Sequence, residues 1–332
     1  MAVVSAIVPT WNRADLLRSI LANLRQQTRP PEQIVVVDNG STDASHLVAR
    51  EFGVDLSSFA ENRGFAAAVN EGIRRAQGDW LLILNNDVVL EPDWLERLLA
   101  TAEQEGAPFA AGKLLQKDGS RVLDGSWDLV SRAAYAWRCG WGRPDGEIWS
   151  TRRKIWFAPM TAALFHRSVF ERIGLLETRF ESYYEDVDFG VRCALAGIEG
   201  VYEPAAVAMH IGTASLGRHA GRVLFLTARN QVLLLAKHYP EKTLFRFAWP
   251  ILVGQTLSVM AAAKKGHLFA ALRGKWEALR QWSSFRQELK KSGASQNVEA
   301  AFARSEREIR NLQRQIGFDI YWRLYFSLVG RA

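Results

Sequence analysis

Cysteine is scarce in this chain of 332 residues, which contains only Cys139 and Cys193. Two cysteines in unrelated contexts exclude a disulfide framework and a four-cysteine zinc site, and they favour a reducing compartment. Long apolar runs are also lacking. The longest, Pro250–Ala263, contains Gln255 and Ser258, and its roughly 14 residues are fewer than the ~20 that cross a bilayer. We therefore expect no transmembrane helix. No basic residue precedes the first apolar run, so we expect no signal peptide.

Three motifs common in α/β enzymes are absent as well. No G-x-G-x-x-G follows the first predicted strand, which argues against a dinucleotide-dependent dehydrogenase. The chain has neither the G-x-x-x-x-G-K-[ST] phosphate loop nor the G-x-S-x-G nucleophile elbow. These absences exclude P-loop nucleotidases and the usual serine hydrolases of α/β sheets.

Hydrophobic residues make up 48% of the chain and charged residues 23%, which is typical of a soluble globular protein. Buried strands and amphipathic helices alternate along the first ~110 residues. Such alternation predicts a mostly parallel sheet covered by helices on both faces. The predicted strands are 3–8, 34–37, 54–59 and 80–84, and the clearest helices are 16–24 and 66–76.

Polar side chains follow these strands, at the edge where sheets of this kind bind ligands. Asp38 ends an apolar strand, and its carboxylate suits either a ligand site or the turn that Asn39 begins. Asn85, Asn86 and Asp87 follow another strand. Their oxygens suit a divalent cation that holds phosphate, or simply a capped turn. The residues by themselves leave both alternatives open.

A second group of candidates lies further along. Glu185, Asp186 and Asp188 open a predicted helix of about residues 186–196, where the helix dipole alone favours acids. A carboxylate beside Tyr183 and Tyr184 is also where a general base could arise. His210 follows a predicted strand and is either a structural histidine or a metal ligand. Aromatic residues concentrate between these groups, as core or as a sugar-binding surface: Trp127, Trp137, Trp141, Trp149 and Trp156.

Taken in order, these motifs resemble glycosyltransferase family 2, the inverting enzymes of GT-A fold, from Ser5 to about Asn230. The acid-poor LNND motif and the basic helical tail resemble those of bacterial rhamnosyltransferases that build O-antigen or other cell-surface glycans. The matching segments are Ile7–Arg13 (IVPTWNR), Val37–Asp43 (VDNGSTD), Glu61–Ala66 (ENRGFA), Leu84–Asp87 (LNND), Glu185–Asp188 (EDVD) with Arg192 and Gly197, His210, and Ala228–Asn230 (ARN).

The resemblance implies an α/β GT-A fold, Rossmann-like, in residues 1–236, with a nucleotide-sugar half (1–112) and an acceptor half (113–236). It implies that Asp186 is the catalytic base, and that Asp87 and His210 bind Mg²⁺ or Mn²⁺. Glu185, Asp188 and Arg192 would support the site. The residues implied around the nucleoside-diphosphate sugar are Pro9, Trp11, Asp38, Asn39, Arg63 and Asn86.

The expected activity is transfer of a sugar, L-rhamnose from dTDP-rhamnose, to a growing or polyprenyl-linked glycan at the inner face of the cell membrane. One alternative is a galactofuranosyl- or other hexosyltransferase that uses a UDP-sugar. A non-catalytic nucleotide-sugar-binding protein is the alternative from a different class. In the resemblance, amides replace family acids before Asp87, so the metal site has a single protein carboxylate.

The net charge of +7 is unevenly distributed. Residues 237–332 contain 17 Lys and Arg against 7 Asp and Glu, whereas residues 1–236 contain 25 against 28. A basic tail predicts contact with an anionic surface. No nucleic-acid-binding fold is recognisable, so we expect no nucleic-acid partner. Apolar residues at helical spacing favour amphipathic helices that rest on a membrane, peripherally and in the cytoplasm. A packed helical hairpin or a homodimer contact is the alternative.

Overall fold

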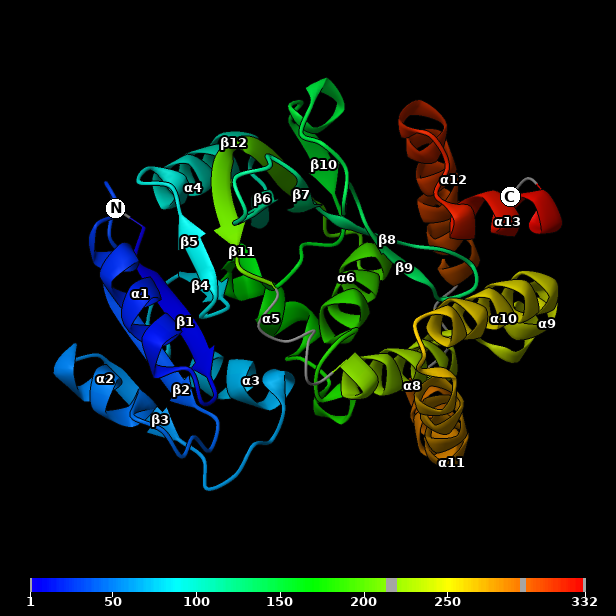
Figure 1. Ribbon diagram of the computed structural model, residues 1–332, viewed down its shortest axis with the longest axis horizontal. Helices are drawn as coiled ribbons and strands as arrows, with labels where there is room; N and C mark the ends of the chain where they lie inside the picture. Colours follow the sequence, from blue (N-terminus) through cyan, green and yellow to red (C-terminus); the bar gives the residue numbers. More distant parts are fainter. Residues whose placement is uncertain (1, 213–219, 293–296, 331–332) are drawn as a thin grey trace. The chain divides into compact units, whose positions relative to one another are not determined.

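A computed structural model describes residues 2–212, 220–292 and 297–330 of the chain (Figure 1). These residues form two compact units. The first comprises Met1–Asp128 and Arg138–Ala214, and the second comprises Leu129–Trp137 and Ser215–Ala332. Most of a small hairpin, formed by β8 (Asp128–Val130) and β9 (Ala136–Arg138), therefore belongs to the second unit.

The first unit is a sheet flanked by helices. Its strands are β1 (Val4–Thr10), β2 (Gln33–Asp38), β3 (Asp55–Ser58), β4 (Trp80–Leu84), β5 (Val88–Leu90), β6 (Phe109–Gln116), β7 (Leu123–Gly125), β10 (Arg153–Ile155), β11 (Ala162–His166) and β12 (Gly200–His210). Its helices are α1 (Ala14–Arg25), α2 (Ser45–Glu51), α3 (Phe65–Arg75), α4 (Trp94–Glu105), α5 (Arg167–Ile173) and α6 (Glu185–Leu195), with short 3-10 turns at Glu147–Trp149 and Thr178–Phe180.

The sheet is parallel in its N-terminal part and mixed beyond it. The strand order is β10-β12-β6-β11-β4-β1-β2-β3, with β5 paired to β12 and β7 to β6. Strands β3, β2, β1 and β4 are parallel neighbours, and β12 runs parallel to β6. Antiparallel β11 joins β4 to β6. The α/β fold class with a helix-flanked sheet, expected from the sequence, is confirmed.

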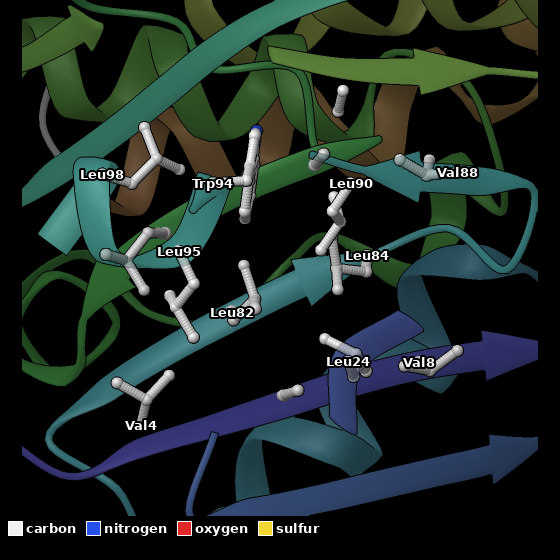
Figure 2. Close-up of a cluster of buried hydrophobic side chains, with 14 of the residues drawn as sticks. Val4, Val8, Leu24, Leu82, Leu84, Val88, Leu90, Trp94, Leu95 and Leu98 are labelled. Carbon is white, nitrogen blue, oxygen red and sulfur yellow. The ribbon is translucent and has the colours of Figure 1, made fainter. Parts of the chain in front are cut away.

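Side chains alternate between the two faces of the sheet along each strand. Helices cover both faces, so all seven residues of β1 are buried. Val4, Ala6 and Val8 of β1 face a core that also holds residues of α1 and α4 (Figure 2). Ile7 points to the opposite face, where α3 approaches so closely that a Cβ on Gly72 would lie 2.2 Å from the Ile7 Cγ2 atom. Burial on two faces explains why these strands have continuous apolar sequences.

The parallel register places several strand ends at one edge. Thr10, the last residue of β1, pairs with Asp38, the last residue of β2. The Asn86 side-chain amide, just beyond β4, donates a 2.9 Å hydrogen bond to the Thr10 hydroxyl. Residues far apart in sequence thus meet where such sheets bind ligands.

Strand β12 includes His210, which the sequence predicts just after a strand. It spans Gly200–His210 because a register shift between Glu203 and Val207 lets the strand continue past Pro204, which cannot donate a ladder hydrogen bond. The far end of β12 pairs with β5, and His210 lies opposite Val88. This extension is what brings His210 beside Asp87.

The second unit is helical. Helix α8 packs along α11 through small residues, and a Cβ on Gly274 would lie 2.3 Å from the Phe225 carbonyl oxygen. Buried Glu306 accepts hydrogen bonds from the Arg132 guanidinium at 2.7 Å and from the Tyr325 hydroxyl at 2.8 Å. The helices are α8 (Ala220–His238), α9 (Glu241–Arg246), α10 (Ala248–Lys264), α11 (Leu268–Ser292), α12 (Val298–Ile316) and α13 (Ile320–Val329).

The boundary between the two compact units differs from the domain boundary predicted at residue 236. Helix α8 makes its extensive contacts with α11, so it belongs to the helical unit, which follows Ala214. The residues 113–236 expected as an acceptor half are thus shared between the two units. Within the described ranges, we find no helix with the length and apolar character needed to span a membrane.

The core of the sheet gives a direct test of the fold. Leu82 is fully buried in central strand β4 and lies among the residues shown in Figure 2. We expect Leu82→Ala to lower the free energy of unfolding by about 2–5 kcal/mol, because it removes buried methyl groups and leaves a cavity. Urea unfolding of the purified protein measures this change. Leu47→Ala, on the exposed side of α2, is the matched control and should change stability by less than ~0.5 kcal/mol.

Candidate active site

The turn after β2 fixes the first candidate residues. Asp38 is buried, and its Oδ1 atom accepts a 3.0 Å hydrogen bond from the Ser41 backbone. The neighbouring Asn12 has a positive φ of 52°, and its side-chain oxygen accepts a 2.7 Å hydrogen bond from the Thr42 backbone. The turns after β1 and β2 therefore hold each other in place. Both of the sequence alternatives for Asp38 remain compatible with this geometry, because one carboxylate oxygen caps the turn.

Trp11 and Pro9 lie on the same edge but differ in exposure. Pro9 is buried within β1 and pairs in register with Val37. Trp11 lies just beyond the strand with 44% of its surface exposed. An exposed indole beside the strand ends offers a flat apolar face.

Asn39 organises the loop that carries Arg63. The Asn39 side-chain oxygen accepts a 2.8 Å hydrogen bond from the Arg63 backbone, and its amide donates to the Gly64 carbonyl at 3.1 Å. The guanidinium of Arg63 lies 5.0 Å above the centre of the Phe59 ring. Both polar atoms of the Asn39 side chain are thus engaged in holding this loop, which positions Arg63 near Asp38.

The Arg63 loop in turn packs on the segment before α6. The Ala66 backbone donates to the Glu181 carbonyl at 2.9 Å, and a Cβ on Gly64 would lie 2.8 Å from Glu181. Glu181, Tyr183 and Tyr184 all have positive φ values, of 61°, 66° and 72°. Non-glycine residues in this region are strained, and such residues cluster at functional sites. The Arg63 loop and the segment that leads into the acidic start of α6 are therefore neighbours.

Burial distinguishes the three acids of α6. Asp188 is fully buried, and one of its oxygens accepts a 3.0 Å bond from Arg192, which also donates to the Ile173 carbonyl. Glu185 is also buried, and no hydrogen bond reaches its Oε2 atom among the described residues. Burial and the nearby charge of Asp186 raise the pKa of Glu185 well above its usual range. Asp186 is only partly buried, so it is the acid of this group that a substrate can reach.

Arg138, from strand β9, links Asp186 to other carboxylates. Its guanidinium lies 3.8 Å from Asp186, 3.4 Å from Asp128 and 3.8 Å from Asp124. Burial raises the pKa of Asp128 to about 7, and the charge of Asp186 adds to this, although Arg138 opposes it. A single cation thus lies among three carboxylates from different segments, and it is Asp128 among them whose pKa is raised.

His210 connects this group to Asp87. Its Nδ1 atom lies 2.8 Å from an Asp124 oxygen, and its Nε2 atom lies 3.2 Å from an Asp87 oxygen. Burial alone would lower the pKa of His210, but hydrogen bonds and charge interactions with the two carboxylates outweigh it and raise the pKa to about 9. Asp87, His210, Asp124, Arg138 and Asp186 therefore form one continuous polar chain.

The donor set at Asp87 and His210 fits a hard divalent cation. Neighbouring ligands around Mg²⁺, with bonds of about 2.1 Å, lie roughly 3 Å apart, close to the 3.2 Å between the Asp87 and His210 atoms. Asp124 on Nδ1 is the outer-shell carboxylate that usually orients a metal-binding histidine. In the part of the chain described, no three His, Cys, Asp or Glu side chains form a metal-binding group. Asp87 and His210 would thus need ligands from elsewhere.

Sequence reasoning did not identify Arg138, Asp124 or Asp128. All three lie in the tryptophan-rich segment, where neither periodicity nor a motif marks them. One feature could have identified them: they are charged residues in short strands that are otherwise buried. Burying a charge is costly unless it is paired with an opposite charge. Trp127 and Trp149 from this segment are buried with ring centres 5.7 Å apart, so for them the core interpretation is correct. Trp141 is exposed.

Comparison with known proteins identifies relatives of this chain. The family model described as glycosyl transferase family 2 matches residues 5–174, about half of the chain. The O-antigen biosynthesis protein RfbC of Myxococcus xanthus is 30% identical over 64% of this chain, but the match covers only 17% of RfbC. An N-acetylglucosaminyl-diphospho-decaprenol L-rhamnosyltransferase of Mycobacterium tuberculosis is 26% identical over 71% of this chain and 85% of its own length.

Solved structures share the fold. A mannosyltransferase from Pyrobaculum calidifontis, in complex with GDP-Man and Mn²⁺, aligns over 98% of this chain and 86% of its own, with a TM-score of 0.53 and 19% identity. GalNAc-T7, with UDP, GalNAc and Mn²⁺, aligns over 96% of this chain and 58% of its own, with a TM-score of 0.62 and 12% identity. The family match covers the strand ends that carry Asp38, Asn86 and Asp87, and the chain belongs to glycosyl transferase family 2.

Proposed function

We propose that this family 2 glycosyltransferase transfers L-rhamnose from dTDP-rhamnose to a polyprenyl-linked or growing cell-surface glycan, with inversion at the anomeric carbon. The observation that carries the catalytic part is the partly exposed carboxylate of Asp186, held beside Arg138 at one end of the Asp87–His210–Asp124 chain. The choice of sugar and acceptor is supported by the rhamnosyltransferase and O-antigen relatives, which share 26–30% identity with this chain.

Asp186 is the general base in this proposal. A sugar hydroxyl is a poor nucleophile, so a carboxylate must accept its proton as it attacks the anomeric carbon. Glu185 is a poor candidate because its side chain is buried, and this burial raises its pKa. Asp188 is a poor candidate because it is fully buried and paired with Arg192. Arg138 positions Asp186 and balances its charge.

The diphosphate leaves from the opposite face of the sugar, so a single displacement inverts the anomeric carbon. Asp87 and His210 are proposed to hold a Mg²⁺ or Mn²⁺ ion against this diphosphate. When bound, such an ion neutralises the negative charge that grows on the leaving group. Asp124 holds the Nδ1 side of His210, which leaves Nε2 facing Asp87. The two phosphates would supply the remaining ligands.

Asp38 is proposed to recognise the base. Its carboxylate can accept the imide N–H that thymine and uracil carry and that adenine lacks. Trp11, with its exposed indole, would stack on the ring. Uracil offers the same imide, so the geometry at Asp38 equally supports a hexosyltransferase that uses a UDP-sugar. The two candidates differ only in the donor.

The role of Asp186 is tested by Asp186→Asn, which keeps the shape of the side chain and removes the proton acceptor. We expect turnover to fall by ~10²-fold or more while binding of dTDP, followed by thermal shift, is retained. Asp15→Asn makes the same change at an exposed position in the first turn of α1 and should leave turnover unchanged. Normal turnover in Asp186→Asn would show that another group takes the proton.

The metal site is tested by calorimetry with Mn²⁺. We expect binding to strengthen at least tenfold when dTDP is present, because two protein ligands are too few for a tight site. Asp87→Ala and His210→Ala should abolish this gain. Since the ion must replace the proton that His210 carries below its pKa of about 9, affinity should rise between pH 7 and pH 9. Tight Mn²⁺ binding without nucleotide would contradict the proposed ligand set.

Base recognition is tested by competition among nucleoside diphosphates. We expect dTDP and UDP to protect the protein against thermal unfolding more strongly than GDP and ADP, because bound ligand stabilises the folded state by mass action. Asp38→Asn should reduce this preference, whereas Asp43→Asn in the same turn should retain it. Equal protection by all four nucleotides would remove the proposed role of Asp38.

A further inference from the structure

Helix α10 has an unusual distribution of apolar residues. No charged residue occurs from Phe247 to Ala263, and one face of the helix is buried through Pro250, Val253 and Leu257. The opposite face is also apolar apart from the exposed Thr256. Its large side chains are exposed, with 54% of Trp249, 59% of Leu252 and 58% of Met260 accessible to solvent. A helix at the surface of a globular protein normally presents polar residues there, so this face indicates an interaction surface.

Neighbouring elements of the same unit extend this surface. Phe245, at the end of α9, is 87% exposed. The Trp249 indole donates a 3.0 Å hydrogen bond to the backbone carbonyl of Leu328 in α13. The Leu328 side chain is also exposed. Helix α11 adds a further exposed stripe at helical spacing. Its large members are Phe269, Leu272, Trp276 and Leu279.

Basic residues flank the charge-free stretch of α10 at both ends. Arg246 precedes it, Lys264 and Lys265 follow it, and all three are exposed. Residues 237–332 as a whole carry ten more basic than acidic side chains. Apolar side chains between Lys and Arg residues match the boundary of an anionic bilayer, where the apolar groups enter the acyl region and the cations meet the headgroups.

The same charges disfavour a second copy of this chain as the occupant. In a two-fold symmetric dimer the same patch occurs on both partners, so the basic residues at the two ends of α10 would lie within one shared interface. Like charges placed together in an interface are costly. Charge complementarity therefore favours a surface with negative charge.

We propose that the exposed apolar face of α10, formed by Trp249, Leu252 and Met260 and extended by Phe245 and Leu328, docks the helical unit onto an anionic lipid bilayer. The helix lies in the plane of the membrane, because its other face is buried within the unit. This inference rests on the helical unit alone and is independent of the sugar transferred and of the catalytic residues.

Flotation of the full-length protein with vesicles tests the proposal. One set of vesicles contains phosphatidylglycerol and phosphatidylcholine, and the other contains phosphatidylcholine only. We expect binding to the anionic vesicles at 50 mM NaCl, with a several-fold loss at 500 mM because salt screens the charges. The double variant Leu252→Gln, Met260→Gln should bind at least tenfold more weakly. Its control, Leu47→Gln with Trp141→Gln, changes equally exposed residues of the first unit and should bind normally.

The charge component has its own pair of variants. Lys264→Glu with Lys265→Glu should weaken binding to anionic vesicles severalfold. Lys117→Glu with Lys154→Glu, which makes the same change in net charge on the first unit, should weaken it far less. Light scattering of the same proteins measures the oligomeric state. Absence of wild-type binding at low salt, or a dimer that the Leu252 and Met260 substitutions dissociate, would overturn the proposal.

Discussion

Asp124, Asp128 and Asp186 come from three separate segments of the first unit, and all three lie within 4 Å of one guanidinium, that of Arg138. Buried carboxylates repel one another and lose hydration, so they can share a site only with a counter-charge or with retained protons. Arg138 provides that charge on the Asp186 side, and His210 provides it between Asp124 and Asp87. The proposed base and the proposed metal ligands are thereby parts of a single electrostatic arrangement.

The three acids at the start of α6 differ in burial, and their chemical properties differ as a result. Three acids occupy the first turn of α6, where the helix dipole favours all of them equally. Asp188 is buried and paired, Glu185 is buried with a raised pKa, and Asp186 is accessible. The segment before α6 contains three non-glycine residues with positive φ values, and its Glu181 packs against the Arg63 loop. Burial thus leaves one of the three carboxylates, that of Asp186, partly exposed, as the proposed base requires.

The helical unit is stabilised by different interactions. Its interior is held by an ion pair between Arg132 and Glu306, with the Tyr325 hydroxyl on the same carboxylate. The close contact of α8 with α11 depends on Gly274, where the helices approach too closely for a side chain. Its surface departs from the usual polar exterior along α10, where exposed Leu252 and Met260 lie between basic ends. The proposed catalytic residues thus belong to the first unit, and the proposed membrane-docking surface belongs to the second.

The sequence by itself determined the N-terminal sheet and the family motifs. Strand β4 spans the predicted residues 80–84, and Asp38 and Asp87 lie at the expected strand ends, because apolar runs and turn residues are local signals. Tertiary structure alone decided the partners of these residues. Asp124 and Arg138 lie in short irregular strands without periodicity, and the extension of β12 to His210 depends on its pairing with β5 and β6. The packing of α8 against α11 is likewise a matter of tertiary contacts. Periodicity reports which face of an element is buried, whereas the choice of partner depends on contacts between residues distant in the chain.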